Sequence, residues 1–213
     1  MIRIRHKRIQ IPTMLKSTLA ALFLAAASVL HATDISNDLN KAQTNAVGVG
    51  ETVVVTTPVA DSPWPSVRVY TRVNAPVDTM KEVFLDYKNS PSFLTNLISA
   101  TVVNQPAPNI YDVRYVNKLP IVGSTTSTVR NWYSQDGDAL VVNWNLLSSP
   151  LAEKSTGQLR VEPLGTGKSL MRYTNYVVPK SSLAVLAKNA ALSEVKATVA
   201  ALKKEAERRA AAQ

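Results

Sequence analysis

One pattern repeats between residues 100 and 178: short segments of alternating apolar and polar residues, separated by turns of a few residues. Alternation with a period of two is typical of β-strands that bury one face. The six predicted strands are 100–105, 110–117, 125–135, 139–147, 156–162 and 169–178. Connections this short leave no room for crossover helices, so the pattern predicts an antiparallel meander.

The residues on either side of these strands predict what covers the sheet. A further strand is expected at 66–73, then a helix from 77 to about 87 and a short helical turn opening at Ser90. After Pro179, a long helix is expected to start from Ser181 or Ser182 and run to about residue 209, with one apolar face. This order predicts an α+β fold: a curved antiparallel sheet of about seven strands, covered by the long C-terminal helix.

The first 32 residues have the composition of a secretory signal. They contain five basic residues and no acid, and a run of about a dozen apolar residues ends before His31-Ala32-Thr33. Such a segment is typically removed on export, which predicts a periplasmic or secreted protein cleaved near Ala32. A cut near Ser28, a start at Met14 and an uncleaved anchor are the alternatives, although the run is short for spanning a bilayer.

Removal of residues 1–32 changes the chemistry available to the chain. The net charge falls from +9 to +4, and His6 and His31, the two histidines of the sequence, are lost. Because the sequence also lacks cysteine, serine–histidine catalysis, thiol catalysis and the usual zinc sites are excluded from the mature chain. The modest charge has no basic–aromatic stripe, so no nucleic-acid partner is expected.

The sequence contains no phosphate-binding glycine motif, and no metal or cofactor is expected. Asp136 and Asp138 form the one close acidic pair outside the terminal helix, and they flank Gly137. This triplet predicts a hairpin turn in preference to a metal site. Residues 33–63 are interpreted as an N-terminal extension or linker, with a flexible joint at 47–50 and a short extra strand at 52–57.

Several segments resemble the helix-grip superfamily, which includes START-like, pollen-allergen-like and polyketide-cyclase-like (SRPBCC) proteins. These segments are 70–80, 86–93, 157–165 and 169–179, in the family's order and spacing. The resemblance implies a seven-stranded helix-grip domain over 64–213, with a cavity between the sheet and the C-terminal helix. Asn175, in place of an apolar residue, and Val178, in place of a polar one, depart from the family pattern.

The resemblance also implies a function. Members commonly bind lipids, sterols, quinones or other apolar small molecules, so an exported binding or carrier protein is the leading hypothesis. An enzyme of the polyketide cyclase or dehydrase kind, using tyrosine or carboxylate groups, is the second, and a non-catalytic structural or interaction module is the third. Whether the protein is an enzyme stays open, although it has little catalytic equipment, and its oligomeric state is unknown.

Strand parity predicts which side chains face the cavity. Ionic residues fall on the opposite face of each strand, as an apolar pocket requires. The expected cavity residues are Tyr111, Val113, Tyr115, Val142, Trp144, Leu146, Leu159, Val161, Met171, Tyr173, Asn175, Leu192, Val195 and Val199. No catalytic residue is assigned, and for each of these positions a satisfied core role is the alternative.

Two basic features are harder to place. Many START-like proteins pair an arginine with an acid on the strand that carries Arg130, but here the next residue is Asn131. Arg130 is therefore expected in solvent, with its register open. The basic residues of the terminal helix, Lys203, Lys204, Arg208 and Arg209, allow transient contact with anionic lipid, but a solvated helix end is the preferred interpretation.

Overall fold

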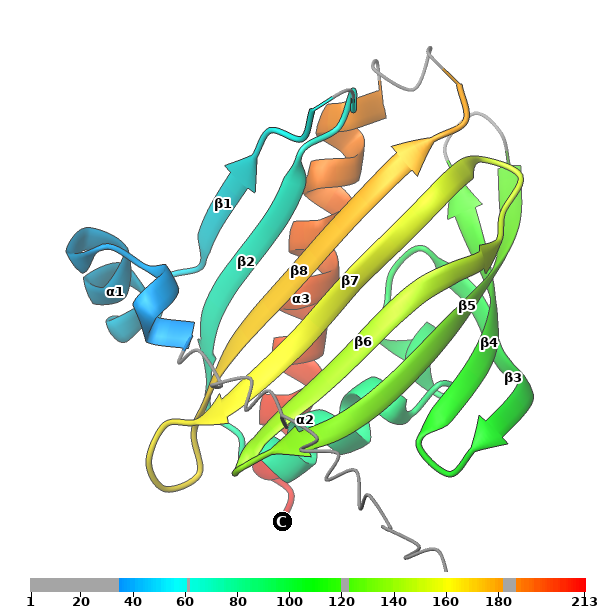
Figure 1. Ribbon diagram of the computed structural model, residues 1–213. Helices are drawn as coiled ribbons and strands as arrows, with labels where there is room; N and C mark the ends of the chain where they lie inside the picture. Colours follow the sequence, from blue (N-terminus) through cyan, green and yellow to red (C-terminus); the bar gives the residue numbers. More distant parts are fainter. Residues whose placement is uncertain (1–34, 61, 120–122, 182–186) are drawn as a thin grey trace, which may run out of the picture. The chain divides into compact units, whose positions relative to one another are not determined.

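The computed structural model describes residues 35–60, 62–119, 123–181 and 187–213, and the predicted signal segment lies outside these ranges. Eight strands form one antiparallel sheet in the order β1-β2-β8-β7-β6-β5-β4-β3 (Figure 1). Their bounds are β1 Val53–Thr57, β2 Ser66–Val73, β3 Leu97–Ala107, β4 Ile110–Leu119, β5 Gly123–Asp136, β6 Ala139–Ser148, β7 Ala152–Pro163 and β8 Ser169–Pro179. The predicted α+β helix-grip fold is confirmed, and β1, which pairs with β2, adds an eighth strand.

The expected hairpin between β5 and β6 is present. Asp136 pairs with Ala139, so the connection is Gly137 and Asp138. Gly137 has a φ of 58°, in the left-handed region that a tight hairpin turn requires and that glycine adopts without a steric penalty. Asp136 accepts a hydrogen bond from Arg160 Nη1 at 2.9 Å, so this carboxylate is paired within the sheet.

The long helix α3 (Lys188–Ala210) packs on one face of the sheet, called the inner face here (Figure 1). Alternate residues of the strands meet the apolar side of α3, and Val199 and Leu202 are almost fully buried there. The helix begins later than the predicted serine cap, because Ala187 occupies the N-cap position without a side-chain hydrogen bond. Residues 182–186, which include the other expected cap, lie outside the described ranges.

Two short elements close one end of the inner face. Helix α2 (Val77–Leu85) and the single turn η2 (Ser90–Ser92) follow β2, as the sequence predicts. Arg209 of α3 donates to Asp86 at the end of α2 at 2.7 Å and lies 6.0 Å from the ring centroid of Phe93. Glu205 accepts from Arg209 and Arg208, each at 2.7 Å. These contacts fix the C-terminal half of α3 against α2 and η2.

The opposite, outer face of the sheet is partly covered by the N-terminal segment. The turn η1 (Ile35–Asp38) and helix α1 (Lys41–Gly48) pack with Tyr70 and Leu170, and both Ile35 and Tyr70 are completely buried. Tyr70 lies on the strand face that the sequence predicts to be polar. It is buried because this second layer covers it.

The expected joint at 47–50 is partly helical in the structure. Asn40 caps α1 through a capping box with Gln43, and Val47 near the end of the helix is buried. Gly50, with a φ of 96°, is the residue at which the backbone turns toward β1. The capping box and the buried valine stabilise a helix where the glycines alone predicted a flexible connection.

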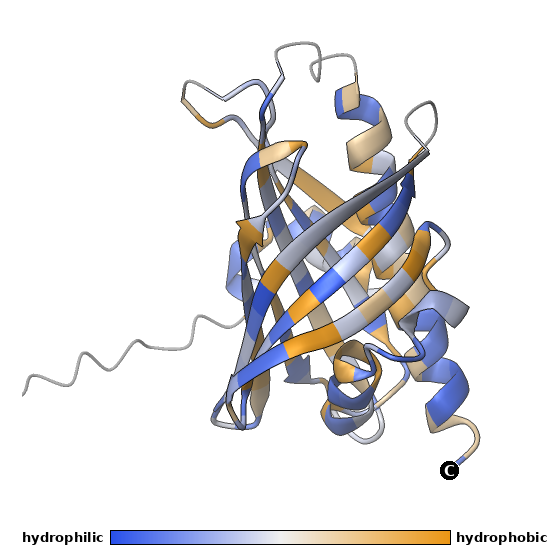
Figure 2. Cartoon of the chain, turned by 90° about the vertical axis from the view of Figure 1, so that its right-hand side faces the viewer, coloured by the Kyte–Doolittle hydropathy of each residue, from blue (hydrophilic) through white to orange (hydrophobic). Residues whose placement is uncertain are grey.

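Hydrophobic and hydrophilic residues alternate along the strands (Figure 2), and this alternation separates the inner core from the outer surface. The inner core joins β2, β6, β7 and β8 to α2 and α3. A smaller apolar cluster lies between β3, β4 and the chain around Tyr87. No helix in the described part of the chain is both long and apolar enough to cross a bilayer.

Candidate functional site

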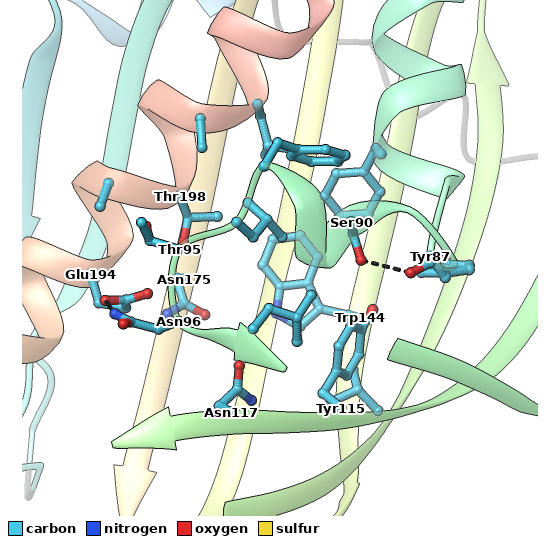
Figure 3. A pocket seen from close by; sticks show the side chains of 18 of the residues that line it. Tyr87, Ser90, Thr95, Asn96, Tyr115, Asn117, Trp144, Asn175, Glu194 and Thr198 are labelled. Carbon is cyan, nitrogen blue, oxygen red and sulfur yellow. Dashed lines mark hydrogen bonds between the residues drawn. The ribbon is translucent and has the colours of Figure 1, made fainter. Parts of the chain in front are cut away.

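A cavity of about 270 Å³ lies between the inner face of the sheet, α3 and the segment that leads from α2 to β3 (Figure 3). Its lining is mixed in character. The apolar side chains are Val83, Phe84, Phe93, Leu94, Leu97, Val129, Trp144, Ala197, Ala201 and Leu202. The neutral polar ones are Tyr87, Ser90, Thr95, Asn96, Tyr115, Asn117, Ser127, Asn131, Ser155, Tyr173, Asn175 and Thr198.

Trp144 lies centrally on the sheet side of the cavity. Its ring is 5.0 Å from the ring of Tyr173 and 6.1 Å from the ring of Phe84, centroid to centroid. Gly157 is its register partner on β7, and the absence of a side chain there leaves room for the indole. The aromatic cluster therefore joins β6, β8 and α2 into one apolar wall.

Polar groups converge from β4, β5 and β8. Asn131 is 3% exposed, and its Nδ2 donates to the hydroxyl of Tyr115 at 3.4 Å and to the carbonyl of Val129 at 3.5 Å. Tyr173 lines the cavity, and its hydroxyl makes no hydrogen bond with the described residues. Burial raises the pKa of both Tyr115 and Tyr173, and the neighbouring Tyr173 adds to the rise at Tyr115. Both phenols are therefore protonated at neutral pH and able to donate.

One acidic group lines the cavity. Glu194 of α3 is exposed and accepts a hydrogen bond from Asn96 Nδ2 at 2.5 Å, which connects α3 to the segment after η2. In Figure 3, Thr95 and Asn175 lie on the same side of the view as this pair, away from Tyr87 and Ser90. No lysine or arginine lines the cavity within the described ranges.

The opposite side of the lining is formed by Tyr87 and Ser90. Ser90 Oγ donates to the Tyr87 carbonyl at 2.7 Å, the interaction drawn in Figure 3. The Tyr87 hydroxyl is fully covered and has no hydrogen-bond partner in the described part of the chain. Burial is the main cause that raises the pKa of Tyr87. This phenol belongs to the apolar cluster beside the cavity, where it also contacts the rings of Tyr111 and Tyr115.

The structure separates the predicted cavity residues into several groups. Those on the cavity wall are Tyr115, Trp144, Tyr173 and Asn175. Those packed in the buried core are Val113, Val142, Leu159, Val161, Met171, Val195 and Val199. Leu192 lines a separate hollow of about 30 Å³, which also borders Asn175, and Tyr111 and Leu146 are half-buried away from both. Strand parity predicts the inner face, but packing against α2 and α3 decides where that face stays open.

Sequence reasoning missed Asn131 and the lining residues around η2. The register of β5 is uncertain from its sequence because Thr125–Thr128 hides the alternation. Asn131 in fact pairs with Tyr111 on β4 and with Trp144 on β6, so it shares the inner face. Val129 and Tyr133 lie two residues before and after Asn131, and the alternation of these large side chains along β5 indicates that Asn131 faces inward with them. The η2 residues reach the cavity by tertiary folding, for which no local signal exists.

Arg130 lies on the outer face, away from the cavity. Its Nε and Nη2 donate to the two carboxylate oxygens of Asp112 on β4, at 2.6 and 2.9 Å. Asp112 also accepts from Asn104 Nδ2 at 3.0 Å. These hydrogen bonds, chiefly from Arg130, lower the pKa of Asp112. The sequence predicts Arg130 in solvent, whereas the structure pairs it with Asp112 of the neighbouring strand β4.

The basic end of α3 makes contacts within the protein. Arg208 and Arg209 bind Glu205, and Arg209 also binds Asp86. Lys203 Nζ lies 3.5 Å from the hydroxyl of Thr71. These contacts account for three of the four basic residues considered for lipid contact. The described ranges contain no group of three histidine, cysteine or acidic residues arranged to hold a metal ion.

A known protein family matches most of this chain. The family described as "Polyketide cyclase / dehydrase and lipid transport" matches residues 65–207, which include all of the cavity lining. No curated protein matches this chain closely enough to count as a relative. The family match begins just before β2, so it leaves out η1, α1 and β1.

Solved structures that share this fold include lipid transfer proteins and an aromatase/cyclase. A STAR-related lipid transfer protein from Xanthomonas axonopodis has a TM-score of 0.66 and 17% identity, over 73% of this chain and 93% of that one. Human StAR-related lipid transfer protein 5 has a TM-score of 0.64 and 11% identity, over 75% and 83%. The Zhui aromatase/cyclase from Streptomyces has a TM-score of 0.58 and 19% identity, over 68% and 94%. At these identities the likeness concerns the fold.

Proposed function

Because this chain belongs to the polyketide cyclase / dehydrase and lipid transport family, we propose that it binds an apolar small molecule non-covalently and carries it. The observation that carries this proposal is the cavity of about 270 Å³, with the Trp144 aromatic cluster on its sheet side and α3 opposite. Concave sites lined by aromatic and aliphatic side chains with a few polar groups are typical of small-molecule binding. A filled core would have favoured a purely structural module.

Binding is favoured over catalysis by the positions of the acids. A cyclase or dehydratase using a carboxyl group needs that group inside the cavity with a raised pKa. The buried Asp112 lies on the outer face and has a lowered pKa, and Glu205 is paired with two arginines and also has a lowered pKa. Glu194 is exposed at the cavity lining. No acid–base pair is therefore assigned.

The binding proposal is tested by filling the cavity from α3. Ala201 lines the cavity, whereas its neighbour Ala200 is exposed and does not line it. Ala201→Leu and Ala200→Leu are the same substitution, and both residues favour helix. The full chain is purified from its own compartment, and apolar molecules released by solvent extraction are identified by mass spectrometry.

The wild type and Ala200→Leu are expected to retain an extracted molecule and to bind single-chain alcohols in calorimetric titration. Ala201→Leu is expected to lose most of both. If the wild type yields no extracted molecule and binds no apolar compound, the carrier proposal is wrong. If both leucine variants bind like the wild type, the cavity is not the binding site.

We also propose that the protein is exported and acts in the periplasm or outside the cell. The support is the basic start of the chain followed by an apolar run that ends near Ala32. N-terminal sequencing of the protein from fractionated cells is expected to begin at Thr33. An intact Met1 in the cytoplasmic fraction would contradict export, whereas an N-terminus near Val29 would move the cut.

A further inference from the structure

The size of the cavity limits what it can hold. Drug-sized ligands occupy pockets of roughly 300–1,000 Å³, and this cavity of about 270 Å³ lies just below that range. A short single chain or a small ring system fits, whereas a two-chain phospholipid does not.

The charge of the lining limits the ligand further. Its described residues include no basic side chain, and Glu194 is the one acidic residue. An anionic ligand would bury its charge without a counter-ion, which is far more costly than burying a neutral group that is hydrogen-bonded. Glu194 would add repulsion. A cationic ligand could reach Glu194, but this carboxylate is exposed and already accepts from Asn96.

The interior nevertheless offers hydrogen bonds. The hydroxyls of Tyr115 and Tyr173 come from β4 and β8, and both side chains line the cavity on the inner face of the sheet. Asn131 belongs to β5, which lies between β4 and β8 in the sheet order. The Tyr173 hydroxyl has no acceptor among the described residues, and Tyr115 accepts from Asn131 while its own proton has no acceptor there. Both phenols stay protonated because burial raises their pKa. Two donors are therefore available beside an apolar wall.

We propose that the cavity selects an uncharged amphiphile with one short apolar body and an alcohol or carbonyl oxygen, which accepts hydrogen bonds from Tyr115 and Tyr173. The apolar body lies against Trp144 and the side chains around η2. This inference rests on the proposed carrier function and names the chemistry of its ligand. A carboxylate with an apolar chain of the same length is the ligand class that the cavity is expected to discriminate against.

Three ligands with one ten-carbon chain test the selection: 1-decanol, decanoate and decylammonium, titrated calorimetrically into the full-length protein at pH 8. Decanol is expected to bind, and decanoate to bind about a hundredfold more weakly because its charge is buried unpaired. Decanoate affinity is expected to rise as the pH falls and its carboxyl group becomes neutral. Decylammonium binding as tight as that of decanol would overturn the proposal in favour of recognition by Glu194.

Two tyrosines on β8 supply a matched pair of variants. Tyr173 lines the cavity, and Tyr176 lies on the outer face with Lys154 over its ring. Tyr173→Phe is expected to weaken decanol binding about threefold to tenfold, the effect of one lost hydrogen bond, and Tyr176→Phe to leave it unchanged. Equal affinities in the two variants would show that the Tyr173 hydroxyl does not contact the ligand. Thermal unfolding of both checks that each is folded.

The outcomes separate this inference from the function on which it depends. If none of the three ligands binds but an apolar molecule is extracted from the wild type, this inference alone is wrong. If none binds and nothing is extracted, the carrier proposal itself fails. If decanol and decanoate bind equally at pH 8, the protein is a carrier but does not select for charge, and this inference alone is wrong.

Discussion

The indole of Trp144 occupies the space that a side chain at position 157 would need. A β-carbon built on Gly157 would lie 2.1 Å from Trp144 Cζ2 and 2.3 Å from the carbonyl oxygen of Thr174. The first contact belongs to a large packed ring and the second to backbone, so neither partner can move away easily. Gly157 is thus the residue that lets the central aromatic side chain of the cavity lie close against the sheet.

Gly157→Ala is expected to destabilise the fold by about 1–3 kcal/mol, the usual cost of overpacking a core, and to weaken decanol binding. Urea unfolding measures the first effect and calorimetric titration the second. Gly48→Ala, at the end of α1, is the control, since no atom lies within 4 Å of a β-carbon there. Unchanged stability in Gly157→Ala would mean that Trp144 has an alternative position.

The ion pairs of Glu205 predict an acid-dependent loss of stability. Its hydrogen bonds with Arg208 and Arg209 lower its pKa from 4.5 to about 2. Because the folded-state pKa is depressed, the stabilisation is fully present above pH 4.5 and is lost as the pH falls toward 2. A pKa difference of one corresponds to about 1.4 kcal/mol, so the drop from 4.5 to about 2 sets an upper limit of about 3–4 kcal/mol. Solvent screening at Arg208, whose side chain is 65% exposed, reduces the contribution below that limit.

Glu205→Gln is therefore expected to unfold at a lower temperature at pH 7 and to lose less stability than the wild type between pH 4.5 and pH 2. Thermal unfolding across this pH range measures both. Glu153→Gln, an exposed residue on β7, serves as the control. Parallel pH profiles for the wild type and Glu205→Gln would show that the ion pairs contribute little.

Arg130 is expected to affect stability without affecting the ligand. Arg130→Met removes the bidentate partner of Asp112, whose side chain is 7% exposed, and leaves that carboxylate with Asn104 as its side-chain partner. The expected result is a lower Tm with unchanged decanol affinity, because the pair lies on the outer face. Arg114→Met, an exposed position on β4, is the control. Weaker binding with an unchanged Tm would instead connect Arg130 to the cavity.

The N-terminal segment is expected to contribute to the stability of the whole domain. Asp38 Oδ2 accepts from Arg172 Nη1 at 2.5 Å and from the Tyr70 hydroxyl at 3.3 Å, and all three side chains are largely buried. Asp38→Asn keeps an acceptor but removes the charge that faces Arg172. A destabilisation of about 1–3 kcal/mol is expected in urea unfolding, against no change in Asp138→Asn at the exposed hairpin turn. Identical unfolding of both variants would mean that the segment packs independently of this pair.

The strands and their faces were readable from the sequence because alternation is a local property. β2 begins and ends at the predicted residues, and the β5–β6 turn has the predicted Asp-Gly chemistry. Placing Asn131 failed because threonines and serines hide which residues of β5 face inward. The start of α3 was also missed, since a serine suited to capping does not show that the helix begins there.

Composition and periodicity by themselves determined the α+β class, the antiparallel sheet, most of the inner face and the lack of cysteine. Only the tertiary structure decided which inner residues line a cavity, because the open space depends on how α2, η2 and α3 lie over the sheet. It also decided that Tyr70 is buried and that Arg130 pairs with Asp112. Both depend on contacts between distant segments, and the residues of one segment do not specify the neighbour that will cover them.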